Sequence, residues 1–246
     1  MLQWLIVIPA RLQSSRLAKK MLQNARGKPL ILKTYEHVLA LRSKTIQVLI
    51  ATDADEIFSV CRSAGAECVM TSAKHQSGSD RVFEAASLYE APFILNLQGD
   101  EPEVSLEDVK SLMQNFAAQS DAAIGTLVFK NLDETAFQDP NIVKAVLNQK
   151  SQALYFSRAA IPFRRLDDSE NRTKEFFFWQ HIGVYAYRRE SLKSFCQAGP
   201  SELEGLEKLE QLRALQMGMT IYAQQANKIS YGIDTQQDLD AYNAKK

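Results

Sequence analysis

Apolar runs that alternate with helical patterns constrain this chain more than any other feature. Trp4–Ile8 is a continuous apolar run that ends at Pro9, as expected for a strand buried on both faces of a sheet. Gln47–Ala51 and Phe93–Leu97 have the same strand-like character. Helical patterns lie between these runs, at Leu30–Leu41, Ala54–Ala64 and Ser79–Tyr89. The alternation predicts an α/β fold with a mainly parallel, Rossmann-like sheet that is flanked by helices.

The pattern changes after Asp121. Strand-like runs follow with fewer long helices between them, at Ala123–Phe129, Val143–Leu147, Ala153–Phe156 and Ile182–Tyr187. They predict a smaller mixed β extension outside the main sheet. The charged, unpatterned segment Arg164–Glu175 predicts an exposed, mobile loop. Leucines at helical spacing predict a helix over Leu203–Leu215, and a last helix is predicted over Thr235–Ala244. Because no repeat or linker interrupts the 246 residues, a single domain over 1–246 is expected.

Composition excludes several classes of protein. Lys and Arg together number 29 and so do Asp and Glu, which argues against binding to nucleic acid or to an anionic membrane. No apolar run approaches the roughly 18 residues of a membrane span, and the opening residues do not resemble a signal peptide, so a cytoplasmic protein is expected. Cys61, Cys68 and Cys196 match no metal, redox or disulfide spacing and are predicted to be buried apolar residues.

The charges are nevertheless unevenly placed. Seven basic residues precede Glu36, the first acidic one: Arg11, Arg16, Lys19, Lys20, Arg26, Lys28 and Lys33. This block begins directly after the first strand, where α/β proteins place anion-binding loops, although a solvated face is an equally ordinary explanation. The loop matches neither the dinucleotide-binding nor the P-loop motif. Its small residues and spaced cations instead suit a triphosphate.

A second strand end carries a carboxylate. The segment Asn96–Pro102 reads Asn-Leu-Gln-Gly-Asp-Glu-Pro, so Asp100 follows a buried strand on a glycine turn. This arrangement is a common way to hold Mg²⁺ against substrate phosphates. A turn cap is the structural alternative for Asp100.

Ordered motifs over nearly the whole chain resemble those of the CMP-Kdo synthetases, the 3-deoxy-manno-octulosonate cytidylyltransferases, a branch of the sugar nucleotidyltransferases. The motifs are Ile8–Arg11 with Ser14–Leu17, Ala51–Asp53, Gln76–Arg81, Asn96–Pro102, Ala153–Arg158 with Ile161–Pro162, His181–Tyr185, Leu209–Arg213 and Gly232–Thr235. The resemblance implies a nucleotide-diphospho-sugar transferase fold. It also implies a reaction of CTP with a 2-keto-3-deoxy sugar acid, Kdo, that yields a CMP-sugar for lipopolysaccharide and releases pyrophosphate.

The resemblance further implies a role for individual residues. Ala10, Arg11, Ser14 and Lys20 would approach the nucleotide, and Ser77, Gly78 and Arg81 would help to enclose it. Asp100 and Asp234 would bind Mg²⁺, and together with Lys20 and Arg16 they would form the catalytic set. The sugar acid would face Arg16, Gln98, Arg158, His181, Tyr185, Glu210 and Gln211. Residues of about 122–188 would form the sugar-acid side and a homodimer interface.

One loop departs from the family pattern. The family usually has Arg-Leu-Pro-Gly-Lys-Pro-Leu, where this chain has Arg16-Leu17-Ala18-Lys19-Lys20-Met21-Leu22. Lys20 keeps the register of the family lysine, but the proline and glycine that stiffen and open the loop are absent. A binding protein that has lost turnover is therefore one alternative. A synthetase for another acidic sugar, such as 8-amino-Kdo or a nonulosonate, is a second.

Several of these side chains also have structural explanations. Asp53 with Glu56, Ser105 with Asp108, and Thr235 with Asp238 each fit a capping box or its acidic variant. Asp234 could cap the last helix, and His181 could be a hydrogen-bonded core residue. Lys20 could be solvated, and Glu210 and Gln211 could lie on the wet face of a helix. Asp53-Ala54-Asp55 imitates the D-x-D motif of glycosyltransferases, a third alternative, but a helix cap explains it better.

Overall fold

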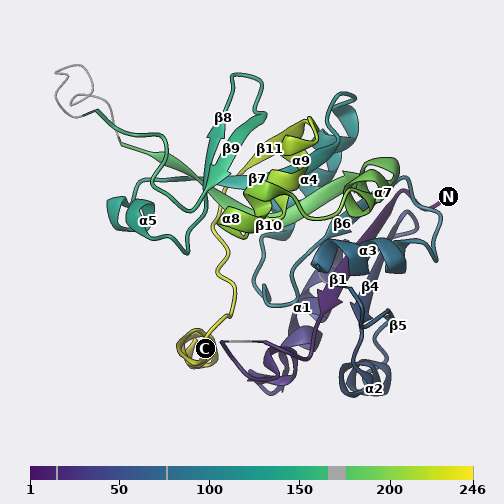
Figure 1. Cartoon of the computed structure of the whole chain (residues 1–246). Coiled ribbons are helices and arrows are strands. Elements are labelled where there is room, and N and C mark those ends of the chain that lie inside the picture. Colours follow the sequence, from purple (N-terminus) through teal and green to yellow (C-terminus); the bar gives the residue numbers. More distant parts are fainter. Residues whose placement is uncertain (15, 76, 166–175, 246) are drawn as a thin grey trace.

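A mixed sheet runs through the molecule, which the computed structural model describes over residues 1–14, 16–75, 77–165 and 176–245 (Figure 1). In order across the sheet, the strands are β11 (Ile221–Ala226), β7 (Ile124–Asn131), β10 (Phe178–Arg188), β6 (Phe93–Asn96), β1 (Trp4–Ala10), β4 (Ile46–Thr52) and β5 (Cys68–Met70). β10 is antiparallel to both neighbours, and the remaining pairs along this path are parallel. The prediction of a mainly parallel sheet is thus confirmed.

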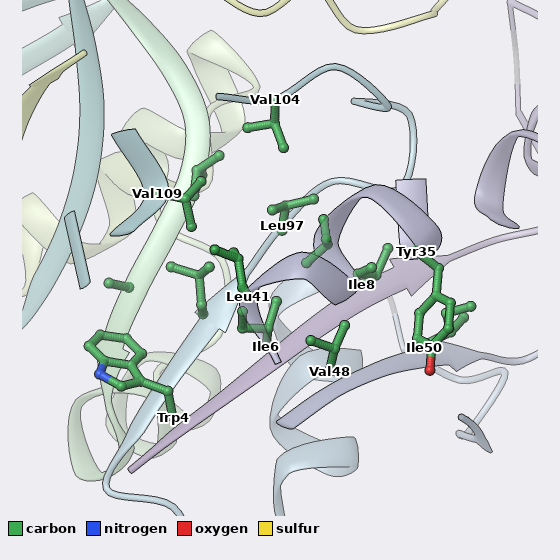
Figure 2. Close-up of a cluster of buried hydrophobic side chains, with 14 of the residues drawn as sticks. Trp4, Ile6, Ile8, Tyr35, Leu41, Val48, Ile50, Leu97, Val104 and Val109 are labelled. Carbon is green, nitrogen blue, oxygen red and sulfur yellow. The ribbon is translucent and has the colours of Figure 1, made fainter. Parts of the chain in front are cut away.

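Helices cover both faces of the sheet, and the side chains of the strands alternate between two cores. Ile6 and Ile8 pack on one face with α1 (Leu30–Val38), α2 (Asp55–Ser63) and α4 (Leu106–Ala118), as Figure 2 shows in part. Leu5 and Val7 pack on the other face with α3 (Gly78–Ala86), α7 (Arg189–Gln197) and α9 (Gln211–Gln216). This period of two explains why the central strands read as unbroken apolar runs.

The extension predicted after Asp121 is present only in part, because β7 and β10 belong to the main sheet and only β8 and β9 extend from it. β8 (Lys144–Leu147) pairs antiparallel with both β10 and β9 (Ala153–Ser157). Together with α5 (Glu134–Gln138), these strands lie at the end of the molecule that is remote from β1 and β4 (Figure 1). Most of the loop predicted at 164–175 falls on residues 166–175, which lie outside the described residues, as do Ser15 and Gln76 of the family motifs.

Segments far apart in the sequence meet below the sheet. α10 (Gln236–Ala244) packs against the hairpin of β2 (Asn24–Ala25) and β3 (Lys28–Pro29) (Figure 1). The Arg26 guanidinium lies 4.0 Å from the ring centroid of Tyr242, and the backbone N–H of Arg26 donates to Asn243 Oδ1 at 2.7 Å. The start of the chain and residues 233–244 are therefore held together.

The structure corrects one predicted helix. Leu203–Leu215 is broken into α8 (Glu202–Glu207) and α9, because Lys208 takes the left-handed conformation with φ 54°. Leucine periodicity continues across this break, which is why the sequence indicated one helix. β5, α7 and β11 were not predicted either, since each is short and lacks a distinctive apolar run.

The capping boxes have mixed outcomes. Thr235 and Asp238 form the predicted box, so Asp234 is not the cap of α10. Ser105 caps α4 alone, because the Asp108 carboxylate accepts from Asn227 instead. The prediction for Asp53 is wrong: Ala54 occupies the N-cap of α2, and the Asp53 carboxylate pairs with Arg81. Cys61 and Cys68 are free and buried as expected, whereas Cys196 is only half-buried.

Candidate active site

A cavity of about 1070 Å³ opens at the carboxyl ends of β1 and β6. Thirteen of the residues predicted for the site line it: Arg11, Ser14, Arg16, Lys20, Gly78, Arg81, Gln98, Asp100, Arg158, Tyr185, Glu210, Gln211 and Asp234. They come from segments up to about two hundred residues apart in the sequence, yet they surround one space. The topology explains part of this convergence, because β1 and β6 are parallel and end at the same edge of the sheet, whereas the other residues come from α3, β10, α9 and loops.

One wall of the cavity carries Asp100 and Asp234, and we call it the acidic wall. Lys20 lies between these two carboxylates. Its Nζ donates to Asp100 Oδ2 and, at 2.8 Å, to Asp234 Oδ1. Burial alone would lower the pKa of Lys20, but the adjacent carboxylates outweigh it and raise the pKa above its ordinary value. Lys20 is therefore a charged, held side chain, and a freely solvated lysine is excluded as its explanation.

Backbone contacts bring the two aspartates together. The N–H of Ile233, the residue before Asp234, donates to the carbonyl of Asp100 at 2.9 Å. A Cβ on Gly99 would lie 3.2 Å from the carbonyl oxygen of Pro9 and 3.0 Å from Met21 Sδ, so a glycine allows the turn before Asp100 to approach β1 closely. The turn is fixed further by Thr34, whose hydroxyl donates to the Gly99 carbonyl at 2.8 Å.

Asp100 and Asp234 are the two carboxylates at the cavity that could take part in a metal site. The Lys20 ammonium already occupies the position of a cation between Asp100 and Asp234, and the described residues contain no cluster of three or more His, Cys, Asp or Glu side chains fit to hold a metal. Mg²⁺ characteristically binds through one or two carboxylates together with phosphate oxygens and water. Asp100 and Asp234 fit that chemistry. Glu101 turns away from this pair to accept from Ser230, and its burial, with repulsion from Asp100, raises its pKa to about 7.

The loop that departs from the family pattern is anchored at both lysines. Lys19 has φ 48°, a left-handed conformation that favours glycine, and its Nζ contacts both oxygens of Glu56 on α2 at 3.0 and 2.8 Å. Arg16 Nη2 lies 2.9 Å from Asp234 Oδ2. The added charge of Lys19 is therefore directed to α2, and Lys20 and Arg16 are directed to the aspartates.

Three buried polar atoms at the cavity have no hydrogen-bond partner among the described residues. They are Arg81 Nε, Asn96 Oδ1 and Gln211 Nε2, and all three side chains line the cavity. An unsatisfied buried donor or acceptor costs about 1–3 kcal/mol, so a ligand that supplies the missing partners is favoured. Asn96 was missed in the sequence as a site residue, although a buried amide that ends an apolar strand was the available signal.

The break between α8 and α9 shapes the opposite wall. Lys208 and Leu209 line the cavity there, and Glu210 accepts a 2.6 Å hydrogen bond from the Ser79 hydroxyl of α3. Burial raises the pKa of Tyr185 well above its ordinary value, so its neutral hydroxyl donates to Gln211 Oε1 at 3.0 Å. Glu210 and Gln211 lie at the start of α9, and in one continuous helix they would lie in its middle.

Arg158 is held rigidly at the extension side of the cavity. Its Nε donates to the backbone carbonyl of Glu207 at 2.8 Å, and its Nη1 donates to the carbonyl of Pro140 at 3.0 Å. The fully buried ammonium of Lys144 supports the same turn by donating to the Arg158 carbonyl at 2.6 Å. The guanidinium is thus pre-positioned for an anionic ligand.

Three predicted site residues do not line the cavity. Ala10 is buried within β1, and Ser77 caps α3 by accepting from the N–H of Asp80. His181 Nε2 lies 3.0 Å from the Thr126 hydroxyl, and burial lowers the pKa of this imidazole to about 3. These contacts support the structural explanation, in which His181 is a hydrogen-bonded core residue. Asp53 of the D-x-D imitation also does not line the cavity.

Comparisons with known proteins agree with this architecture. The family model for cytidylyltransferases matches residues 5–229. A 3-deoxy-manno-octulosonate cytidylyltransferase of Francisella tularensis subsp. novicida is 41% identical over 239 residues, which is 96% of this chain and 95% of that protein. One from Chlorobium phaeobacteroides is 41% identical over 237 residues, or 96% of this chain and 94% of that protein.

Solved structures extend the likeness to the fold. A CMP:2-keto-3-deoxy-manno-octonic acid synthetase complexed with CTP has a TM-score of 0.88 at 35% identity and covers 98% of this chain and 97% of its own. A cytidylyltransferase from Leptospira borgpetersenii, with a TM-score of 0.64 at 14% identity over 99% of this chain and 86% of its own, shares the fold alone. The chain belongs to the cytidylyltransferase family, within its 3-deoxy-manno-octulosonate cytidylyltransferase branch.

Proposed function

We propose that this protein transfers CMP from CTP to the anomeric hydroxyl of Kdo and releases pyrophosphate. One observation carries the proposal: a single cavity brings the cations Lys20 and Arg16 and the carboxylates Asp100 and Asp234 opposite the polar wall of Arg158, Tyr185 and Gln211. The first wall suits a triphosphate, and the second suits an acidic, hydroxylated sugar. The family relationship supports the choice of both substrates.

The reaction needs positioning more than covalent help from the protein. The anomeric oxygen forms a bond to the α-phosphorus as the bond from that phosphorus to the bridging oxygen of pyrophosphate breaks, and the hydroxyl proton is lost. Arg158, held at its Nε and Nη1, would fix the sugar carboxylate, and Lys20 and Arg16 would face the charged phosphates. Mg²⁺ held by Asp100 and Asp234 would neutralise charge that develops on the phosphate oxygens.

A homodimer and a cytoplasmic location are further parts of the proposal. Large apolar side chains are exposed on the segment 122–188, which we assign to the sugar-acid side and the dimer interface: Leu132, Leu154, Phe163 and Phe177. Such side chains favour burial against a second copy. Among the described residues no helix is long and apolar enough to cross a membrane. The CMP-sugar product would serve lipopolysaccharide synthesis.

The test is pyrophosphate release measured over a matrix of nucleoside triphosphates and 2-keto sugar acids. We expect CTP with Kdo to give the highest specificity constant. UTP should work poorly, because each buried polar group left unpaired costs about 1–3 kcal/mol. Higher activity with 8-amino-Kdo or a nonulosonate would reassign the acceptor. CTP binding without turnover on any acid would instead support the non-catalytic alternative.

A further inference from the structure

Lys20 occupies the place between two carboxylates that a metal ion would take. We propose that Lys20 is the resident counter-cation of Asp100 and Asp234, and that a divalent cation gains this pair only when nucleotide phosphates draw the lysine ammonium away. The inference rests on the proposed function for the identity of the nucleotide. It adds a coupling between the two ligands: the protein alone binds the metal weakly, and bound nucleotide raises its affinity for the metal.

The contacts of Asp234 carry the first step. Its Oδ1 accepts from Lys20 Nζ at 2.8 Å, and its Oδ2 lies 2.9 Å from Arg16 Nη2. Both oxygens of this carboxylate therefore already face a positive charge. A divalent cation that approaches Asp234 would meet two like charges at close range, and this repulsion opposes its binding.

Burial makes the lysine hard to displace by a metal alone. The Lys20 side chain is 10% exposed, and that of its partner Asp100 is 18% exposed, so solvent screens their attraction only in part. If Lys20 left the pair without a new partner, a nearly buried ammonium would be unpaired, which is strongly unfavourable. A metal ion supplies no such partner for the lysine.

A triphosphate supplies what the metal lacks. Its oxygens can accept from both Lys20 and Arg16, so each cation exchanges one anionic partner for another. Asp100 and Asp234 then lose their counter-charges at the moment when phosphate oxygens become available to complete a magnesium shell. Because each ligand removes the obstacle to the other, the binding of metal and nucleotide must be positively coupled.

The experiment measures metal binding directly, with Mn²⁺ as the probe and water-proton relaxation as the readout. Wild-type protein is titrated with Mn²⁺ in the absence and presence of CTP, and the protein-free Mn²⁺–CTP signal is subtracted. We expect weak binding without CTP and affinity at least ~10-fold higher with it. Tight Mn²⁺ binding by the nucleotide-free wild-type protein would overturn the inference without any variant.

Two variants sharpen the test. Lys20→Met should bind Mn²⁺ without nucleotide at least ~10-fold more tightly than wild type, because the counter-cation is gone. Lys19→Met is the matched control: Lys19 is adjacent in the sequence but pairs with Glu56, so the Mn²⁺ titration of this variant should follow wild type. An unchanged affinity in a folded Lys20→Met protein, or equal gains in both variants, would contradict the proposal. If Lys20→Met does not fold, the comparison of wild-type protein with and without CTP decides alone.

This measurement is separate from the test of the proposed function. Pyrophosphate release reports whether the chain turns over CTP and Kdo. Water-proton relaxation reports whether Mn²⁺ binds to the protein. Turnover together with nucleotide-independent Mn²⁺ binding would support the proposed function and contradict the counter-cation role of Lys20. Nucleotide-dependent Mn²⁺ binding without turnover on any acid would have the opposite meaning.

Discussion

Arg81 Nη2 lies 2.6 Å from Asp53 Oδ2, and this ion pair joins α3 to the end of β4 beneath the cavity. The Arg81 side chain is 1% exposed, and its Nη1 donates to the Thr71 hydroxyl. Asp53 is thus the counter-charge of a buried arginine whose Nε has no hydrogen-bond partner among the described residues.

Asp53→Asn should therefore destabilise the fold as well as the site. Removal of one partner of a buried ion pair leaves an uncompensated charge, and we expect a loss of about 3 kcal/mol in the free energy of unfolding. Urea denaturation measures this loss. Asp55→Asn, at an exposed position in the first turn of α2, is the control and should cost no more than about 1 kcal/mol. Equal losses in the two variants would show that Arg81 does not depend on Asp53.

Asp100→Asn and Asp234→Asn should each lower turnover at least ~100-fold, because each removes a carboxylate that we propose binds Mg²⁺ against the triphosphate. Pyrophosphate release at limiting Mg²⁺ is the measurement. Asp240→Asn is a suitable control, since Asp240 accepts only from the exposed Gln236 amide in the described contacts. Near-wild-type rates in both site variants would remove the metal assignment.

The two loop lysines should behave differently. Lys20→Ala should reduce kcat/KM for CTP about 10-fold to 100-fold, through loss of a charge-assisted hydrogen bond worth about 1.5–3 kcal/mol. Lys19→Gly should be mild, because glycine accepts the left-handed backbone and the lost pair with Glu56 is exposed. The specificity constants of both variants at fixed sugar acid decide the matter. A crippled Lys19→Gly beside a nearly normal Lys20→Ala would mean that the residue register is wrong.

His181 should make folding sensitive to acid. Burial lowers its folded pKa to about 3, below the value of about 6.5 in the unfolded chain, so only the unfolded state gains a proton between these values. Stability from this group is present above pH 6.5 and falls as the pH is lowered towards 3, by at most about 1.4 kcal/mol per pH unit. His181→Gln should flatten this part of the profile relative to wild type. Parallel stability profiles for the two proteins from pH 7 to 5 would show that His181 ionises freely in the fold.

The sequence was most informative where one physical signal determined the structure. The apolar run of β1 predicted a strand buried on both faces, and the glycine turn before Asp100 predicted a carboxylate at a strand end. Most of the predicted site residues also line one cavity, and those that follow β1 and β6 do so because these parallel strands end at the same edge of the sheet. Their chemical roles remain predictions.

Three features of the structure could not be predicted, because they depend on contacts or single backbone conformations that a hydrophobic pattern does not reveal. The break at Lys208 interrupts a regular leucine pattern through one left-handed residue. Asp53 fits a helix cap by local spacing. Its carboxylate instead pairs with the buried guanidinium of Arg81, which lies 28 positions later in the sequence. Asn96 belongs to a predicted strand, and only the packed structure shows that its Oδ1 has no hydrogen-bond partner in the described part of the chain.

The contacts of α10 with the β2–β3 hairpin can form only after nearly the whole chain has been synthesised. Lys20 and Arg16 contact Asp234, which is made more than two hundred residues after them. Domains generally fold as units during synthesis. A nascent chain that ends before Asp234 lacks one of the two carboxylates that contact Lys20. The contacts of Lys20 and Arg16 with Asp234 are therefore among the last to form during synthesis.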